Sequence, residues 1–129
     1  MLEKPANLVA LAKATIKECT VTDLADGIAA GTLLIDIREP QEFQRGRLPG
    51  ATLIPRGLLE FEIHPLVARF AGDQGSPPED VPILLYCGTG GRSALAAETL
   101  NRMGYTDVTS LDGGVVAWAQ AGLPLEAPG

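Results

Sequence analysis

The sequence has few of the residues that build metal centres and disulfide frameworks. Its 129 residues include two cysteines and a single histidine, His64. No set of cysteines and histidines has the spacing of a zinc site, so we expect no metal. Two cysteines are too few for a disulfide framework, and a cytosolic chain keeps its thiols reduced.

Long apolar runs and repeats are missing as well. No apolar run is long enough to span a bilayer, so we expect no membrane contact. The amino terminus, MLEKP, lacks the basic region and apolar stretch of a secretory signal. No internal repeat or low-complexity tract is present. These absences predict a cytoplasmic protein.

Positive charge is scarce too. Ten lysines and arginines face 16 aspartates and glutamates, which gives a formal net charge of −6. Nucleic acids require a basic face, so we expect no nucleic-acid partner. Because the chain as a whole does not attract anions, an anionic substrate needs local cations. A hydrophobic content of 46% and a charged content of 20% are typical of one globular domain.

The spacing of apolar residues indicates several helices. Residues 7–18 have the pattern of an amphipathic helix. Thr22 is a typical N-cap for a second, short helix that ends at Gly31. Further helical segments are expected from Pro40, over 57–70 with a break or kink at Pro65, over 93–103, and around Trp118.

Short apolar runs between these helices indicate buried strands. The runs cover 33–37, 53–54, 83–86 and 108–111, and a surface loop rich in proline is expected over 73–82. Strands that alternate with helices predict an α/β fold with a parallel sheet and helices on both faces. Ligands of such sheets bind beyond the carboxyl ends of the strands, where Asp36 and Cys87 lie.

The most informative segment is YCGTGGRS, residues 86–93. Cys87 follows a buried strand and enters a loop whose glycines let successive backbone N–H groups point at one anion. The following helix adds its positive N-terminal end, and Arg92 adds a permanent cation. All of these features favour the thiolate of Cys87, which is the nucleophilic form of cysteine.

Four segments in this order resemble the rhodanese (sulfurtransferase) family. They are LIDIREPQEF at 34–43, GRLPGA at 46–51, CGTGGRS at 87–93, and LDGG at 111–114 followed by Trp118. The similarity extends over about 21–124 and implies a single-domain member with a parallel sheet of about five strands. We therefore expect a helical N-terminal extension at 1–20 and a rhodanese domain at 21–125.

The resemblance implies that Cys87 takes a sulfane sulfur from a donor such as thiosulfate. Cys87 then holds this sulfur as a persulfide and passes it to cyanide or a thiol, without any cofactor. Arg92 is implied to brace the loop and attract anions. The charged terminal sulfur is implied to lie among the backbone amides of Gly88, Thr89, Gly90, Gly91, Arg92 and Ser93.

Other residues have supporting roles in this interpretation. Asp36 caps loops or pairs with an arginine, and Arg38 supports the site beside it. Arg56 either contacts an anionic substrate at the rim of the site or is simply solvated. Arg47 stands where the family commonly has histidine, which places a second cation near the site. Cys19 has no motif around it and is interpreted as a structural thiol.

Three functions remain in competition at this point. The first is a thiosulfate sulfurtransferase that acts on small sulfur-containing anions and thiol acceptors. The second is a persulfide carrier that relays sulfur between a donor and an acceptor protein. The third is a phosphatase-like or regulatory domain. Four residues separate Cys87 from Arg92, whereas related phosphatases have five, and the shorter loop favours a single sulfur atom over a phosphate.

Overall fold

The computed structural model describes residues 1–127, apart from the side chains of residues 73 and 74. Five parallel strands form one sheet in the order β1-β5-β4-β2-β3. The central strand β4 lies between β5 and β2, and its carboxyl end leads directly into Cys87. The strands are β1 (Lys17–Cys19), β2 (Leu33–Asp36), β3 (Thr52–Leu53), β4 (Ile83–Tyr86) and β5 (Val108–Leu111).

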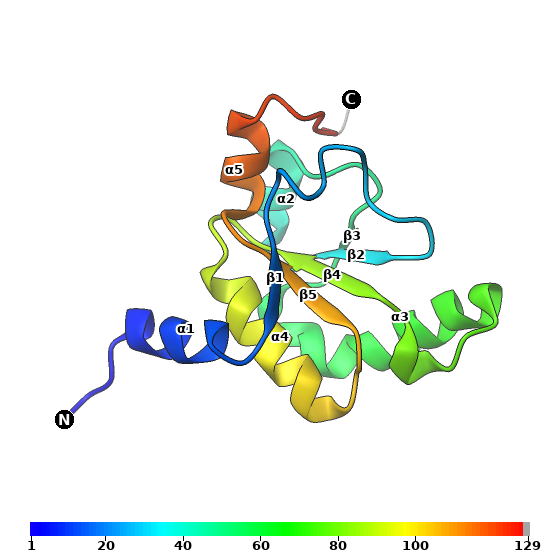
Figure 1. Ribbon diagram of the computed structural model, residues 1–129, viewed down its shortest axis with the longest axis horizontal. Helices are drawn as coiled ribbons and strands as arrows, with labels where there is room; N and C mark the ends of the chain where they lie inside the picture. Colours follow the sequence, from blue (N-terminus) through cyan, green and yellow to red (C-terminus); the bar gives the residue numbers. More distant parts are fainter. Residues whose placement is uncertain (128–129) are drawn as a thin grey trace.

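Helices cover both faces of this sheet, as expected for the α/β fold. Figure 1 shows α1, α3 and α4 on one face and α2 and α5 on the other. Two short 3-10 segments, η1 (Arg56–Leu58) and η2 (Pro78–Asp80), connect the layers. The helices are α1 (Pro5–Lys13), α2 (Pro40–Arg45), α3 (Leu59–Gln74), α4 (Gly91–Met103) and α5 (Gly114–Gln120).

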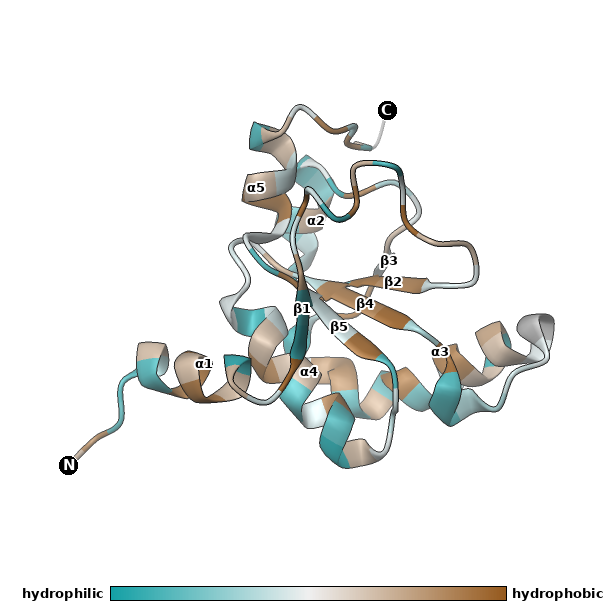
Figure 2. Ribbon diagram, viewed as in Figure 1, coloured by the Kyte–Doolittle hydropathy of each residue, from teal (hydrophilic) through white to brown (hydrophobic). Residues whose placement is uncertain are grey.

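The core has two layers because successive residues of a strand point to opposite faces. In Figure 2 the central strands β2 and β4 are hydrophobic, whereas β1 at the edge of the sheet is hydrophilic. On β4, Ile83 and Leu85 join the larger layer under α3 and α4, together with Cys87. Leu84 and Tyr86 join the smaller layer, which also contains Trp118 of α5. Cys87 therefore continues the alternation of β4 and lies in the larger layer.

The helix expected over 7–18 is shorter, since α1 ends at Lys13 and residues 17–19 form β1. Lys17, Glu18 and Cys19 pair in register with β5. This pairing with a distant strand overrides the local helical spacing, which is only a weak preference. The carboxyl-terminal part of that prediction was wrong.

The helix expected between Thr22 and Gly31 is also absent, and residues 21–26 form turns instead. The capping signal lies earlier: the Thr20 amide donates to Asp23 Oδ2 at 2.8 Å, and the Asp23 amide donates to Thr20 Oγ1 at 3.3 Å. The turns end at Gly27, whose φ of +106° is not helical. A cap therefore forms here without a helix behind it.

Pro65 does not break its helix, because α3 is continuous from Leu59 to Gln74. A proline at this position removes the hydrogen bond to the carbonyl of Phe61. Phe61 is 81% exposed, so solvent rather than the core surrounds the turn that loses this bond.

The loop expected over 73–82 begins after α3 and contains η2, and the strand expected at 53–54 is β3 at Thr52–Leu53. Among the residues described, none of the helices combines the length and apolarity needed to cross a membrane.

Candidate active site

The segment 87–90 forms a tight loop between β4 and α4, with Cys87 only 1% exposed. Gly90 is the N-cap of α4 and has a φ of +107°, in the left-handed region that favours glycine. A Cβ at Gly90 would also lie 3.2 Å from the backbone nitrogen of Gly113. The loop therefore requires glycine at this point, because another chain segment passes directly beside it.

The sulfur of Cys87 receives hydrogen bonds from the start of α4. The backbone N–H groups of Gly90 and Ser93 donate to Sγ at 3.2 Å and 3.4 Å. The Ser93 hydroxyl lies 3.6 Å from the same sulfur. Backbone donors at a helix N-terminus stabilise negative charge. Two backbone amides, those of Gly90 and Ser93, are therefore directed at the sulfur.

A second hydroxyl lies behind the first. Ser93 Oγ is 2.7 Å from Ser110 Oγ on β5, and both serines are fully buried. A thiolate can only accept hydrogen bonds. When Cys87 is ionised, the Ser93 hydroxyl therefore donates to the sulfur, and the Ser110 hydroxyl donates to Ser93. Ser110 was missed by the sequence analysis, since nothing in the local pattern of β5 connects it to Cys87.

Arg92 lies across the loop and binds Glu42 of α2. Its two terminal nitrogens donate to the Glu42 carboxylate at 2.8 Å and 3.1 Å. A Cβ at Gly88 would lie 3.1 Å from Arg92 Nη2. The hydrogen bonds from Arg92 lower the pKa of Glu42 to about 2, and Glu42 in turn raises the pKa of Arg92. Arg92 is thus tied to α2 through Glu42, a partner that the sequence analysis did not identify.

The beginning of α5 holds the loop from the other side. The Val115 amide donates to the Cys87 carbonyl at 3.0 Å, and the Val116 amide donates to the Gly88 carbonyl at 3.1 Å. A Cβ at Gly114 would lie 2.5 Å from both of these carbonyl oxygens. The LDGG segment thus holds the loop in place through close contact between the two backbones, which only glycine permits.

Asp36 and Arg38 form a buried ion pair at the end of β2, with Arg38 Nη2 2.8 Å from Asp36 Oδ2. Arg38 Nη2 also donates to the Gly46 carbonyl at 2.7 Å, and its guanidinium lies over the Tyr86 ring. Burial, followed by the nearby Asp36, raises the pKa of Tyr86. In the described part of the chain, no hydrogen bond or ion pair of Asp36 or Arg38 reaches Cys87. The pair ties the segment after α2 to the sheet.

The remaining sequence candidates lie around the site. Arg56 donates to Glu60 at 2.8 Å and to Thr99 Oγ1 at 3.1 Å, which directs it toward α3 and α4. Arg47 stacks over the Phe43 ring, with 4.3 Å from its guanidinium carbon to the ring centroid. Thr89 is exposed at the tip of the loop.

Cys19 is half-buried, and nothing around it favours a reactive thiolate. Burial, followed by the negative charge of Asp23, raises the pKa of its thiol to about 11. This thiol is thus strongly disfavoured as a nucleophile at neutral pH. Within residues 1–127, no three His, Cys, Asp or Glu side chains are grouped to hold a metal ion.

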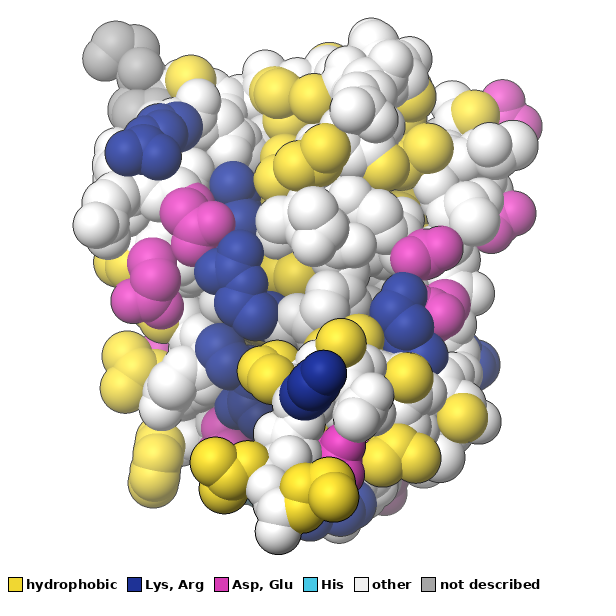
Figure 3. Space-filling model, turned by 90° about the vertical axis from the view of Figure 1, so that its left-hand side faces the viewer, with side chains coloured by type: hydrophobic (Ala, Val, Ile, Leu, Met, Phe, Trp, Pro, Cys, Tyr) yellow, Lys and Arg dark blue, Asp and Glu magenta, His cyan; other side chains and the backbone are white. Residues whose placement is uncertain are grey.

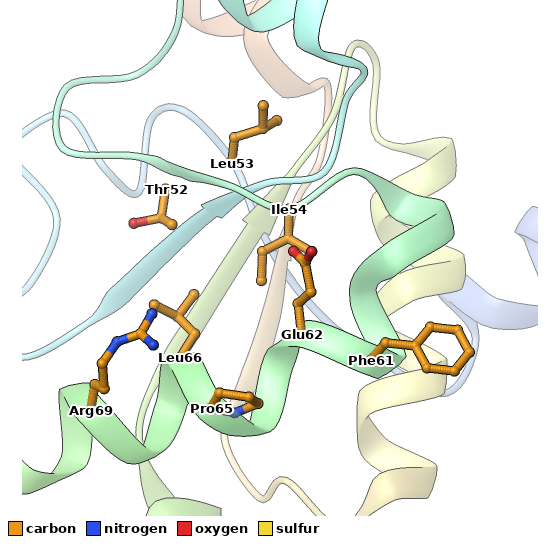
Figure 4. A pocket seen from close by; sticks show the side chains of 8 residues that line it. All are labelled: Thr52, Leu53, Ile54, Phe61, Glu62, Pro65, Leu66 and Arg69. Atoms are coloured by element: carbon orange, nitrogen blue, oxygen red, sulfur yellow. The ribbon is translucent and has the colours of Figure 1, made fainter.

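A cavity of about 300 Å³ lies between β3 and α3, away from the loop. Figure 4 shows that its lining combines apolar side chains with Glu62 and Arg69. None of its lining residues belongs to the segment 87–93. The cavity therefore adds no group to the chemistry of Cys87.

Known proteins resemble this chain in both sequence and structure. The family model of the rhodanese-like domain matches residues 20–121. A sulfurtransferase from Allochromatium vinosum is 36% identical over 96 residues, which cover 74% of this chain and 79% of that protein. The chloroplastic thiosulfate sulfurtransferase 16 of Arabidopsis thaliana is 33% identical over 111 residues, 84% of this chain and 91% of the relative.

A solved structure shows the same fold over nearly the whole chain. It is a protein of unknown function from Rhodopseudomonas palustris, named a possible tyrosine phosphatase. Its TM-score is 0.81 at 34% identity, covering 98% of this chain and 96% of that chain. With the family match over most of its length and sulfurtransferases among its relatives, the chain belongs to the rhodanese-like domain family and is an enzyme of the rhodanese kind.

Proposed function

We propose that this protein transfers a sulfane sulfur from thiosulfate or a persulfide donor to cyanide or a thiol, through a persulfide on Cys87. The observation that carries the proposal is the environment of the Cys87 sulfur. The sulfur lies at the N-terminus of α4 and accepts hydrogen bonds from the backbone N–H groups of Gly90 and Ser93. Such a site stabilises a nucleophilic thiolate without a metal or an organic cofactor.

In the first step, the Cys87 thiolate attacks the outer sulfur of thiosulfate. A bond forms between Sγ and this sulfur, the sulfur–sulfur bond of thiosulfate breaks, and sulfite leaves with the electron pair. In the second step, cyanide attacks the terminal sulfur of the persulfide. The bond to Sγ breaks, thiocyanate forms, and Cys87 returns as a thiolate. Charge and electrons balance in both steps, and no proton transfer is required.

The loop offers further donors for the charged terminal sulfur of the persulfide. The backbone N–H groups of Gly88, Thr89, Gly91 and Arg92 make no hydrogen bond to any residue among those described. Backbone N–H groups in a glycine-rich turn form anion-binding concavities. Arg92 adds its charge at the same place, held against Gly88 by Glu42. These groups support the proposed binding of both the donor anion and the persulfide.

A carrier function would use the same residues, because only the source and destination of the sulfur differ. Rapid turnover of thiosulfate and cyanide supports the enzyme that we propose. Transfer that occurs only from a protein persulfide supports the carrier. Hydrolysis of a phosphate ester would support a phosphatase, although the short loop between Cys87 and Arg92 favours a single sulfur atom.

The experiment that tests the proposal is intact-mass measurement after treatment with thiosulfate. We expect an adduct of one sulfur atom that is lost on reduction and on addition of cyanide. The Cys87→Ser variant should gain no sulfur, whereas the Cys19→Ser variant should behave as the wild type does. A wild-type protein that gains no sulfur from thiosulfate or from a persulfide donor would falsify the persulfide mechanism.

A further inference from the structure

Glu42 of α2 binds the arginine of the segment 87–93 and is itself held in place. Glu42 Oε1 accepts hydrogen bonds from Arg92 Nη1 at 2.8 Å and from the Glu39 amide at 3.0 Å, and Oε2 accepts one from Arg92 Nη2 at 3.1 Å. The bond from the Glu39 amide is part of the capping box at the start of α2. The helix itself therefore directs this carboxylate toward Arg92.

The guanidinium of Arg92 lies beside Cys87. A Cβ at Gly88, the residue after Cys87, would lie 3.1 Å from Arg92 Nη2. Hydrogen bonds to Glu42, and then the nearby Cys87, raise the pKa of Arg92. The sulfur, the guanidinium and the Glu42 carboxylate thus follow one another in space. A sulfur donor that reaches Cys87 meets both charges of the ion pair.

Glu42 balances the charge of Arg92 at neutral pH, because its pKa of about 2 keeps the carboxylate ionised. Lys13 of α1 is balanced in the same way, since it contacts two carboxylates, Glu18 at 3.0 Å and Asp112 at 2.9 Å. On the face drawn in Figure 3, Lys and Arg side chains form a column, and Asp and Glu side chains lie beside it. Negative charge therefore accompanies the positive charge around the site.

Sulfur donors differ in the charge that they bring to this site. Thiosulfate carries two negative charges at neutral pH, whereas the persulfide group of a thiol carries at most one. The second charge of thiosulfate adds repulsion from the Cys87 thiolate and from Glu42. The N-terminus of a helix offers only about half of a positive unit charge. The paired Arg92 and the start of α4 therefore suit one negative charge better than two.

We propose that Glu42 determines donor specificity: by neutralising Arg92, it makes the site favour donors with a single negative charge, such as thiol persulfides, over the thiosulfate dianion. The inference rests on the proposed sulfur transfer through Cys87 and names the class of donor that this chain prefers.

The preferred loading step is an exchange between a thiolate and a persulfide. The Cys87 thiolate attacks the terminal sulfur of the donor and forms a bond between Sγ and that sulfur. The sulfur–sulfur bond of the donor breaks, and the donor leaves as a thiolate with the electron pair. Charge is conserved, and no oxidant or reductant takes part.

Two donors that differ by one charge test this inference. Thiosulfate and methanethiosulfonate both give up an outer sulfur, but in methanethiosulfonate a methyl group replaces one charged oxygen. Thiocyanate formation, with cyanide as the acceptor, gives kcat/KM for each donor at neutral pH and low salt. The donor ratio is kcat/KM for thiosulfate divided by kcat/KM for methanethiosulfonate. Both donors meet the same thiolate, so a change in the reactivity of Cys87 cancels in this ratio.

Glu42→Gln should raise the donor ratio about fivefold. It removes one negative charge, whose repulsion acts on two charges of thiosulfate and on one of methanethiosulfonate. Glu62→Gln is the matched control, because Glu62 is an exposed carboxylate that lines the separate cavity of Figure 4. Its donor ratio should equal that of the wild type. Far-ultraviolet circular dichroism checks that both variants are folded.

The salt dependence of the donor ratio is a second test, and it needs no variant. In the wild type, added salt should raise the ratio, because screening weakens the repulsion of the dianion. In Glu42→Gln, added salt should lower the ratio, because the unpaired Arg92 attracts the dianion most strongly at low salt. The direction of the salt effect therefore reports whether Arg92 is neutralised.

The failure of this inference differs from the failure of the proposed function. A donor ratio that is the same in Glu42→Gln and the wild type, or that falls with salt in the wild type, would overturn the role of Glu42 alone. An equal rise in Glu62→Gln would also overturn it, because net charge would then be the cause. If Cys87 gains sulfur from none of thiosulfate, methanethiosulfonate and a thiol persulfide, the proposed function itself is wrong.

Discussion

Two serines lie behind the sulfur of Cys87, and they differ in what they contact. Ser93 offers both its amide and its hydroxyl to Cys87, whereas Ser110 contacts the hydroxyl of Ser93. Ser110 therefore acts on the sulfur only by orienting another group, which makes it a positioning residue. Hydrogen bonds to a charged acceptor are stronger than those between neutral groups, so Ser93 should contribute more than Ser110.

Removal of these hydroxyls should lower the reactivity of Cys87 by taking hydrogen bonds away from its sulfur. We expect alkylation of Cys87 at neutral pH to slow by about twofold in Ser110→Ala and about tenfold in Ser93→Ala. The measurement is the pH profile of the alkylation rate, read at Cys87 by mass spectrometry. Thr109→Ala is the control on the same strand. An unchanged profile in Ser110→Ala would show that this serine serves packing alone.

The ion pair between Arg92 and Glu42 should contribute to stability above acidic pH. Arg92 lowers the pKa of Glu42 to about 2, below the usual value of about 4.3 for glutamate. A carboxylate with a lowered pKa stabilises the fold above its unfolded pKa, and this contribution disappears as pH falls toward the folded value. Both side chains are partly exposed, so the pair is a moderate one.

We expect Glu42→Gln to lower the free energy of unfolding by about 1 kcal/mol at pH 7. The Glu39 amide donates a hydrogen bond to Glu42 Oε1 at 3.0 Å. Glutamine keeps an oxygen that can accept this bond, so the capping box is retained. Urea unfolding at several pH values measures the difference from the wild type. It should be constant between pH 7 and pH 5 and smaller at pH 3. A difference that does not change with pH would mean that packing, not charge, accounts for the loss.

At the scale of the elements, the start of α5 determines the shape of the reactive loop. A side chain at Gly114 would collide with two carbonyl oxygens of the loop, and its φ of +56° is unfavourable for other residues. We expect Gly114→Ala to lower the free energy of unfolding by about 2–4 kcal/mol and to reduce sulfur transfer. Thermal unfolding and thiosulfate turnover measure the two effects.

Gly57→Ala is the matched control for this substitution. A Cβ at Gly57 has no neighbour within 4 Å, and its φ lies outside the left-handed region. Its stability and activity should stay close to those of the wild type. If both alanine variants behave alike, the close contact between α5 and the loop does not constrain the site.

The elements also show where local sequence patterns succeed. The strands around Cys87 and the helix after it were predicted because continuous apolar runs and helical spacing are strong local signals. β1 was missed because its residues form a strand only through pairing with β5. The helix expected after Thr22 failed for a related reason: a capping residue starts a helix only if the following turns continue it.

At the scale of the whole molecule, the sheet joins two core layers that should unfold together. Ile63 of α3 lies in the larger layer, and Trp118, the only tryptophan, lies in the smaller one. We expect Ile63→Ala to lower the free energy of unfolding by about 2–5 kcal/mol. Trp118 fluorescence and far-ultraviolet circular dichroism should report this loss at the same midpoint. Separate midpoints would show that the two layers unfold independently.

The sequence by itself determined the parallel α/β fold, the family, and the glycine-rich loop that contains Cys87 and Arg92, because these depend on short contiguous patterns. Only the tertiary structure decided what lies around the sulfur. Glu42, Ser110 and Gly114 reach the loop from α2, β5 and α5. Contacts between distant segments follow from how layers pack on a sheet, which no local pattern contains.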